Sequence, residues 1–325
     1  MSPSRRRLLS LALALCPTLL GAQGLPAQKV YRIGWLGTAH EESLWQAFVE
    51  GMRERGWIEG KNLTFERLYS EGRNDRLPAL AVQLVQSKVD LIVTVGTPPS
   101  LAAKNATTSI PIVFFAVGDA VSTGLVASLA RPGGNLTGAS RIGPEQAVKQ
   151  LELLKEIVPG ASRIAMFVND RFPLHTVVRA KVEPAARSLG VTLIPIQVRA
   201  PEDFDAAFAT LARERIDALF VLGEPMIGAQ RERIAQLALD HRMPAVSPFE
   251  LATEAGLLLS YSSRLVDEVR SVPPYVDRIL KGAKPADLPV ERATRFYLSI
   301  NMKTATKIGL TVPPSLLSRA DQVFR

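Results

Sequence analysis

From Lys29 onward, short runs of β-branched and apolar residues alternate with stretches whose apolar residues recur every three or four positions. The runs predict strands, and because most of them are continuously apolar, they suit parallel strands that are covered on both faces. They are Tyr31–Trp35, Leu63–Tyr69, Leu91–Val95 and Ile112–Val117 before a glycine-rich stretch, and Arg163–Val168, Thr192–Gln197, Ala218–Leu222 and Ala245–Ser247 after it.

The stretches between these strands carry the signals of amphipathic helices. Leu44, Phe48 and Met52 form one apolar stripe, Pro144 opens a second helix, and Pro201 with two acidic residues behind it begins a third. Strands that alternate with helices of this length predict βαβ units. The expected fold class is therefore α/β, with parallel sheets.

The stretch 131–140 (RPGGNLTGAS) interrupts the alternation and predicts the first crossing between two α/β lobes. Extended stretches at 257–263 and 296–300 predict two further crossings, with helix-forming sequence over 265–281 between them. Three links would form a hinge that bends while it keeps the lobes together. The predicted units are a signal peptide over 1–24, a first lobe of residues 29–138 and 262–292, and a second lobe of residues 139–261 and 293–325.

The first 24 residues have the pattern of an export signal. MSPSRRR is cationic, LLSLALALCPTLL is apolar, and LLGAQG offers small residues for cleavage. The triple arginine fits either the twin-arginine or the Sec route, and the sequence leaves both open. Cys16, the only cysteine, lies in this segment, so no disulfide, cysteine nucleophile or thiolate metal site is expected in the mature chain. We expect a protein exported to the periplasm.

Composition and motifs argue against nucleic-acid binding and against catalysis. The chain has 39 Lys and Arg against 31 Asp and Glu, a formal charge of +8, but no basic run is interleaved with aromatic residues. There is no GxGxxG, no P-loop and no GxSxG elbow, and the three histidines lack metal-ligand spacing. We therefore expect a binding protein rather than an enzyme, with no catalytic residue, no cofactor and no metal.

Two strand ends in the first lobe carry small polar residues where ligands of open α/β sheets bind. The strand 91–95 leads into Gly96, Thr97 and Pro98, a predicted helix start at which Thr97 is the N-cap and free N–H groups suit an anion. Asp119 follows the next strand and is expected to point into the same crevice. The alternative role for Asp119 is to cap the helix that begins near Ser122.

Other strand ends supply the remaining candidates for ligand binding. Gly37 and Thr38 follow the first strand and would form a third wall of the crevice. The second lobe offers parallel positions at Asn169, Glu224, Phe249 and Tyr261. The two aromatic side chains are suited to stack on a ligand, although a packing role fits them equally well.

Several strings in the chain are specific to one family. They include YRIGWLG, VDLIVTVGTPPSLAAKNATTSIPIVFFAVGDAV, GLVASLARPGGNLTG and YVDRILKGAKPADLPVE. Together they resemble the ABC-transporter substrate-binding proteins of the tryptophan/tyrosine-binding-protein-like family. The resemblance implies a type I periplasmic-binding fold, with two Rossmann-like lobes, three hinge segments and a ligand in the cleft. It also implies an inner-membrane permease and a cytoplasmic ATPase as partners, and no cofactor.

The positions of this chain that match the family are Gly37-Thr38, Gly96-Thr97-Pro98, Asp119 and Asn169. The chain departs from it at Ala120, Asp170 and Glu224, where the family often has proline, proline and aspartate. These departures leave the ligand open, with an aromatic amino acid as one candidate. The expected function is that of a monomeric solute-binding component of an ABC importer. The alternative is a periplasmic sensor subunit that reports a ligand to a signalling system.

Overall fold

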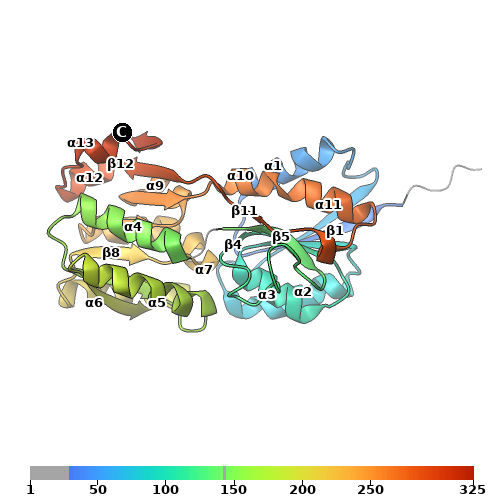
Figure 1. The fold of residues 1–325 in the computed structure, drawn as a ribbon, viewed down its shortest axis with the longest axis horizontal. Helices are drawn as coiled ribbons and strands as arrows, with labels where there is room; N and C mark the ends of the chain where they lie inside the picture. Colours follow the sequence, from blue (N-terminus) through green and yellow to red (C-terminus); the bar gives the residue numbers. More distant parts are fainter. Residues whose placement is uncertain (1–28, 142–143) are drawn as a thin grey trace, which may run out of the picture.

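The computed structural model describes residues 29–141 and 144–325, which form two α/β lobes lying side by side (Figure 1). The predicted signal peptide, with Cys16, lies outside the described residues. Within the described part of the chain, no helix is long and apolar enough to cross a membrane.

The first lobe is built on a parallel sheet with the strand order β11-β5-β4-β3-β1-β2. Because side chains alternate along a strand, neighbouring residues of β3 enter different cores. Val93 packs under α1, α10 and α11, whereas Ile92 packs under α2 and α3. The elements are β1 (Tyr31–Gly37), α1 (Glu42–Arg53), β2 (Leu63–Tyr69), α2 (Leu77–Gln86), β3 (Leu91–Val95), α3 (Thr97–Ala106), β4 (Ile112–Val117), β5 (Leu136–Ser140), α10 (Leu265–Arg270), α11 (Val272–Leu280) and β11 (Glu291–Arg292).

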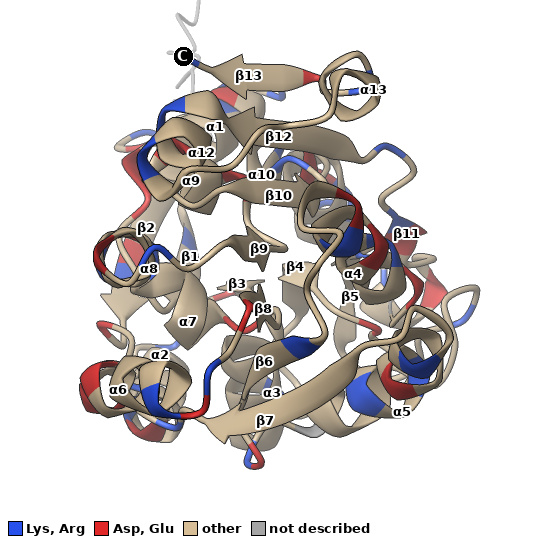
Figure 2. Ribbon diagram, turned by 90° about the vertical axis from the view of Figure 1, so that its left-hand side faces the viewer, with Lys and Arg blue, Asp and Glu red and all other residues tan. Residues whose placement is uncertain are grey.

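The second lobe has the strand order β13-β12-β10-β9-β8-β6-β7, and β10 and β12 are antiparallel. Figure 2 shows this sheet edge-on, with α4 and α5 on one side and α6 and α8 on the other. Its elements are α4 (Pro144–Ile157), β6 (Arg163–Val168), α5 (Pro173–Ser188), β7 (Thr192–Gln197), α6 (Phe204–Arg213), β8 (Ala218–Val221), α7 (Pro225–Ala229), α8 (Arg231–Asp240), β9 (Ala245–Ser247), α9 (Glu250–Glu254), β10 (Leu259–Ser262), β12 (Tyr297–Asn301), α12 (Met302–Ile308), α13 (Pro314–Leu317) and β13 (Gln322–Phe324).

The chain crosses between the lobes three times, after β5, after β10 and after β11. This arrangement confirms the predicted fold class of two parallel-sheet lobes joined by three hinge segments. Since β5 ends at Ser140 and β10 ends at Ser262, the first two crossings begin one or two residues later than the predicted lobe boundaries.

Two local predictions differ from the structure. Residues 136–140, predicted as part of a break, form the buried strand β5. Gly138 has a φ of +146°, and a Cβ there would overlap the carbonyl oxygen of Phe114, so glycine is what allows β5 to lie against β4. The helix predicted over 265–281 is divided at Ser271 into α10 and α11. Pro273 lacks an N–H and its ring excludes the preceding turn, which ends the first helix.

Candidate functional site

A cavity of about 140 Å³ lies between the lobes, at the carboxyl ends of both sets of strands. The sheets place it there, because the loops that follow parallel strands meet at one edge. Its apolar wall includes Leu44, Phe172, Leu174, Leu222, Phe249 and Leu251. Its polar lining consists of Thr38, Glu41, Thr97, Arg141, Gln146, Gln150, Glu224 and Arg231. A lining of this kind suits a small ligand with an apolar body and a few polar groups.

The lobes touch directly at two glycines of the first lobe. A Cβ at Gly96 would lie 2.5 Å from Cγ of Pro225, and a Cβ at Gly118 would overlap Cδ2 of Leu174. The missing side chains let the backbone of one lobe approach the helices α7 and α5 of the other.

The polar contacts that join the lobes include three bridges across the cleft. Glu41 pairs with Arg231 at 2.5 Å, and Arg73 pairs with Glu202 at 2.9 Å. The third bridge runs from Nδ2 of Asn74 to Oε1 of Glu224, also at 2.5 Å. These bridges, with the glycine contacts, describe a closed arrangement in which the two lobes touch each other around the cavity.

Glu224 is the most unusual polar group of the cavity. It precedes α7 and is fully buried. Besides Asn74, it accepts hydrogen bonds from Nδ2 of Asn169, at 3.1 and 3.2 Å. No lysine, arginine or histidine of the described residues forms an ion pair with it. Burial raises the pKa of the Glu224 carboxyl to about 7, although the two asparagines oppose the shift.

His175 shares the partner Asn169 with Glu224, and its stability contribution changes with pH in the opposite direction. Its Nδ1 accepts a hydrogen bond from the backbone N–H of Asn169 at 2.8 Å. Burial lowers the pKa of His175 to about 4, against the opposing effect of the Gly223 backbone. A buried histidine with a lowered pKa loses its contribution to stability as the pH falls from 6.5 towards 4. A buried carboxyl with a raised pKa loses its contribution as the pH rises from 4.5 to 7.

Glutamine takes up no proton, so the variant His175→Gln should not lose stability in the way that the buried histidine does as the pH falls. We therefore expect this variant to gain stability on acidification relative to the wild type. Between pH 6.5 and pH 5 the relative gain should be on the order of 2 kcal/mol. Urea unfolding of the ligand-free protein at several pH values measures it. His241, which is exposed, provides the control, and His241→Gln should follow the wild type. A pH response of His175→Gln parallel to that of the wild type would contradict the assignment.

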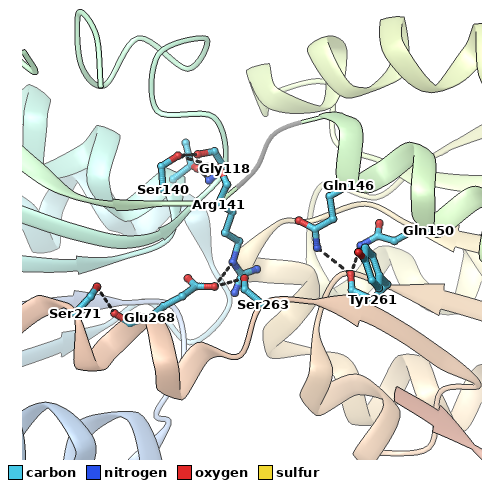
Figure 3. A network of polar contacts seen from close by, with 10 residues as sticks. Gly118, Ser140, Arg141, Gln146, Gln150, Tyr261, Ser263, Glu268 and Ser271 are labelled. Carbon is cyan, nitrogen blue, oxygen red and sulfur yellow. Dashed lines mark hydrogen bonds and ion pairs between the residues drawn. The ribbon is translucent and has the colours of Figure 1, made fainter. Parts of the chain in front are cut away.

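The crossings that border the cavity carry a second polar cluster (Figure 3). Nε of Arg141 donates to Oε1 of Glu268 at 2.9 Å, and the Ser263 hydroxyl donates to the same oxygen. Gln146 and Gln150, one turn apart on α4, both donate to the carbonyl oxygen of Tyr261, at 2.8 and 2.7 Å. Side chains of the first crossing and of α4 therefore hold the second crossing and the strand before it.

The structure brings together only part of the predicted site. Thr38, Gly96, Thr97, Glu224 and Phe249 line the cavity. Pro98 and Asn169 line a larger groove of about 630 Å³, which Glu224 also borders. The remaining three predicted residues, Gly37, Asp119 and Tyr261, line neither space.

The contacts of these three residues with the rest of the protein explain where they lie. Asp119 accepts hydrogen bonds from the backbone N–H groups of Val121 and Ser122 at 3.0 and 3.2 Å, which is the capping role weighed as its alternative. Burial would raise the pKa of Asp119, but these bonds outweigh it and lower the pKa. Gly37 is the last residue of β1, and its carbonyl oxygen accepts a hydrogen bond from the N–H of Ser70. The ring of Tyr261 stacks on the ring of Phe296.

The start of α3 differs from the expected anion site. Gly96 is the N-cap, with a φ of +87°, and Thr97 is the first helical residue. The Thr97 hydroxyl accepts the N–H of Gly118 at 3.2 Å and thereby joins two strand ends. Pro98 and Pro99 have no N–H, and the N–H of Ser100 bonds to Gly96. Thr97 alone is left to offer a backbone donor in this turn.

Several cavity residues were missed by sequence reasoning, namely Glu41, Arg141, Gln146, Gln150, Phe172 and Arg231. A usable signal existed for some of them. Arg141 comes directly after the glycine-rich stretch that predicted the first crossing, and Gln146 and Gln150 share one face of a helix at a spacing of four. Among the described residues, no three His, Cys, Asp or Glu side chains are grouped as a metal site.

Comparisons with known proteins give a matching family and several similar proteins. The model of the family described as ABC transporter substrate binding protein matches residues 40–324. A tyrosine-binding protein of Clostridioides difficile (strain R20291) is 25% identical over 265 residues, which is 82% of this chain and 76% of the relative. A Streptococcus pneumonia ABC domain solved in complex with L-Trp has a TM-score of 0.83 and 26% identity, and the match covers 91% of this chain and 100% of that one. The ligand-free, open structure of a Clostridium difficile substrate-binding protein, 23% identical, has a TM-score of 0.62 over 91% of this chain and 99% of that one.

Proposed function

The chain belongs to the family of ABC transporter substrate-binding proteins, and we propose that it is an exported component of an importer that captures an amino acid between its lobes. The observation that carries the choice of ligand is Glu224. A fully buried carboxylate without a cationic partner is costly, and burial alone accounts for its raised pKa. A ligand ammonium group in the cavity would supply the missing cation.

The rest of the cavity suits the side chain of such a ligand. Phe172 and Phe249, with the leucines of both lobes, form an apolar wall that a hydrophobic or aromatic side chain would fill. The similarity to a tyrosine-binding protein and to a structure that holds L-Trp supports an aromatic amino acid.

Capture would operate by closure of the hinge. In the closed arrangement, Glu41, Arg73 and Asn74 each contact a side chain of the second lobe. A ligand that contacts both lobes favours this state over an open one. In the periplasm, the closed protein would present its ligand to an inner-membrane permease driven by a cytoplasmic ATPase.

The first test is calorimetric titration of the wild-type protein with the twenty amino acids. We expect L-tyrosine or L-tryptophan to bind one to one with a dissociation constant around 1 μM, which corresponds to roughly 8 kcal/mol. Burial in the cavity should give a negative heat-capacity change. Binding of none of the twenty would refute the proposed ligand class.

The role in import needs a cellular measurement. Deletion of the gene should abolish high-affinity uptake of the amino acid that binds, and expression of the full chain should restore it. Undiminished uptake in the deletion strain, with binding intact, would favour the sensory alternative.

A further inference from the structure

We propose that Arg141, on the first crossing between the lobes, holds the carboxylate of the captured ligand and links it to the hinge through Glu268. The inference rests on the proposed function and assigns the second charged group of the ligand, where Glu224 takes the first. The ligand class is then a zwitterion with an apolar side chain.

Most N–H donors of the Arg141 guanidinium have no hydrogen-bond partner among the described residues. Its side chain is 9% exposed, yet it lines the cavity. A guanidinium carries five N–H donors, and only Nε–H of Arg141 has a hydrogen-bond partner among residues 29–141 and 144–325. Neither Nη1 nor Nη2 forms a hydrogen bond with another residue in the part of the chain that the structure describes, and Arg141 lines the cavity. The edge formed by these two nitrogens matches a carboxylate in geometry.

Few other donors in the cavity compete for this role. The turn at the start of α3 offers one backbone N–H, because two prolines follow Thr97 and Ser100 bonds within the turn. The guanidinium of Arg231 is already paired with Glu41 across the cleft, at 2.5 Å. Gln146 and Gln150 direct their amide nitrogens to Tyr261. Arg141 is therefore the cation of the cavity that is best placed for an anionic group.

The link to the hinge runs through Glu268. This residue belongs to α10 of the first lobe, is 7% exposed, and also accepts the hydroxyl of Ser263 on the second crossing (Figure 3). A carboxylate on the outer edge of Arg141 would thus be connected to two of the three crossings. Because a buried ion pair depends on its geometry, a change in the angle between the lobes would move this anchor and release the ligand.

The test compares probes with and without a carboxylate. Calorimetry at pH 7.5 measures L-tryptophan against tryptamine, and L-tyrosine against tyramine, on the wild type and on Arg141→Lys and Arg141→Gln. We expect the wild type to prefer the amino acid by roughly a hundredfold, and Arg141→Gln to lose most of that preference with little change for the amine. Arg141→Lys should be intermediate, since lysine keeps the charge but not the paired donors.

Two further variants distinguish the loss of a carboxylate contact from a general disruption of the site. The double variant Arg141→Gln, Glu268→Gln removes both charges, so no carboxylate is left unpaired, and it should show the same selective loss. Arg231→Gln removes another cavity guanidinium, but one that bridges the lobes, and should weaken amino acid and amine alike.

Several outcomes would overturn the inference. An equal loss for both probes in the double variant, or wild-type binding of tryptamine or tyramine as tight as that of the amino acid, would show that Arg141 does not hold a carboxylate. Either result would leave amine capture by Glu224 intact. Failure of the wild type to bind any of the four probes would refute the inference together with capture of an aromatic amino acid.

Discussion

Replacement of Glu224 by glutamine is expected to stabilise the ligand-free protein at pH 8 while it weakens amino-acid binding by at least a hundredfold. At pH 8 the buried carboxyl, with its pKa raised to about 7, is ionised at a cost that glutamine avoids. The expected gain is up to about 3 kcal/mol. Loss of the partner of a ligand ammonium should cost about as much in binding.

The pH dependence gives this result a second signature. As the pH falls from 7 towards 4.5, the wild-type carboxyl takes up a proton in the folded state and recovers its stability, so the advantage of Glu224→Gln should shrink and disappear. Urea unfolding and calorimetry measure the two quantities. The control is Glu202→Gln, which removes a carboxylate that also bridges the lobes but is largely exposed, and should change both quantities little. Reduced stability at pH 8 with unchanged binding would refute the role of Glu224.

The second large effect is expected from Gly118→Val. In the closed arrangement, any side chain at this position overlaps Leu174 of the other lobe. The φ of Gly118 does not require glycine, so the first lobe itself should accept valine. Because the Leu174 methyl group can shift in part, overpacking of about 1–3 kcal/mol would fall on the closed state alone and weaken ligand binding by roughly five- to a hundredfold.

Calorimetry measures the affinity of Gly118→Val, urea unfolding its stability, and small-angle X-ray scattering its radius of gyration with ligand. We expect an extended form that stays open at ligand concentrations that close the wild type. Gly160 is a matched control, since its φ is also ordinary and a Cβ there meets nothing within 4 Å. Gly160→Val should therefore bind normally. Wild-type affinity in Gly118→Val would show that the lobes do not need this contact.

Much of the fold could be predicted because strands are marked by local patterns. Leu63–Tyr69, Leu91–Val95 and Ile112–Val117 have the same bounds in sequence and structure. Prediction failed at β5, where the role of a residue is set by a contact with another strand and not by its neighbours in the sequence. Gly138 resembles a loop glycine in sequence, yet its lack of a side chain serves the approach of β5 to β4.

The site was harder to predict, for a related physical reason. A strand end fixes where a loop begins, but not whether its polar group turns towards the ligand or back to its own backbone. Asp119 bonds to the next two N–H groups, as short acidic side chains do in turns. Glu224, at an equivalent strand end, is met by Asn74 from the other lobe. Arg141 belongs to no strand or helix, and only the crossing of the lobes brings it to the cavity.

The first lobe is built from two segments that lie far apart in the sequence, and this separation affects the order in which the lobes fold. The apolar face made by Trp35, Val93 and Phe115 is covered in part by Val272 and Val276. These partners are separated by more than 150 residues of chain, most of which belong to the second lobe. Contacts of such high sequence separation carry a large loop-closure cost and form slowly. The second lobe, whose β6 to β10 are continuous in sequence, should therefore gain structure first, and the lobe that begins the chain should be among the last parts to become protected from hydrogen exchange.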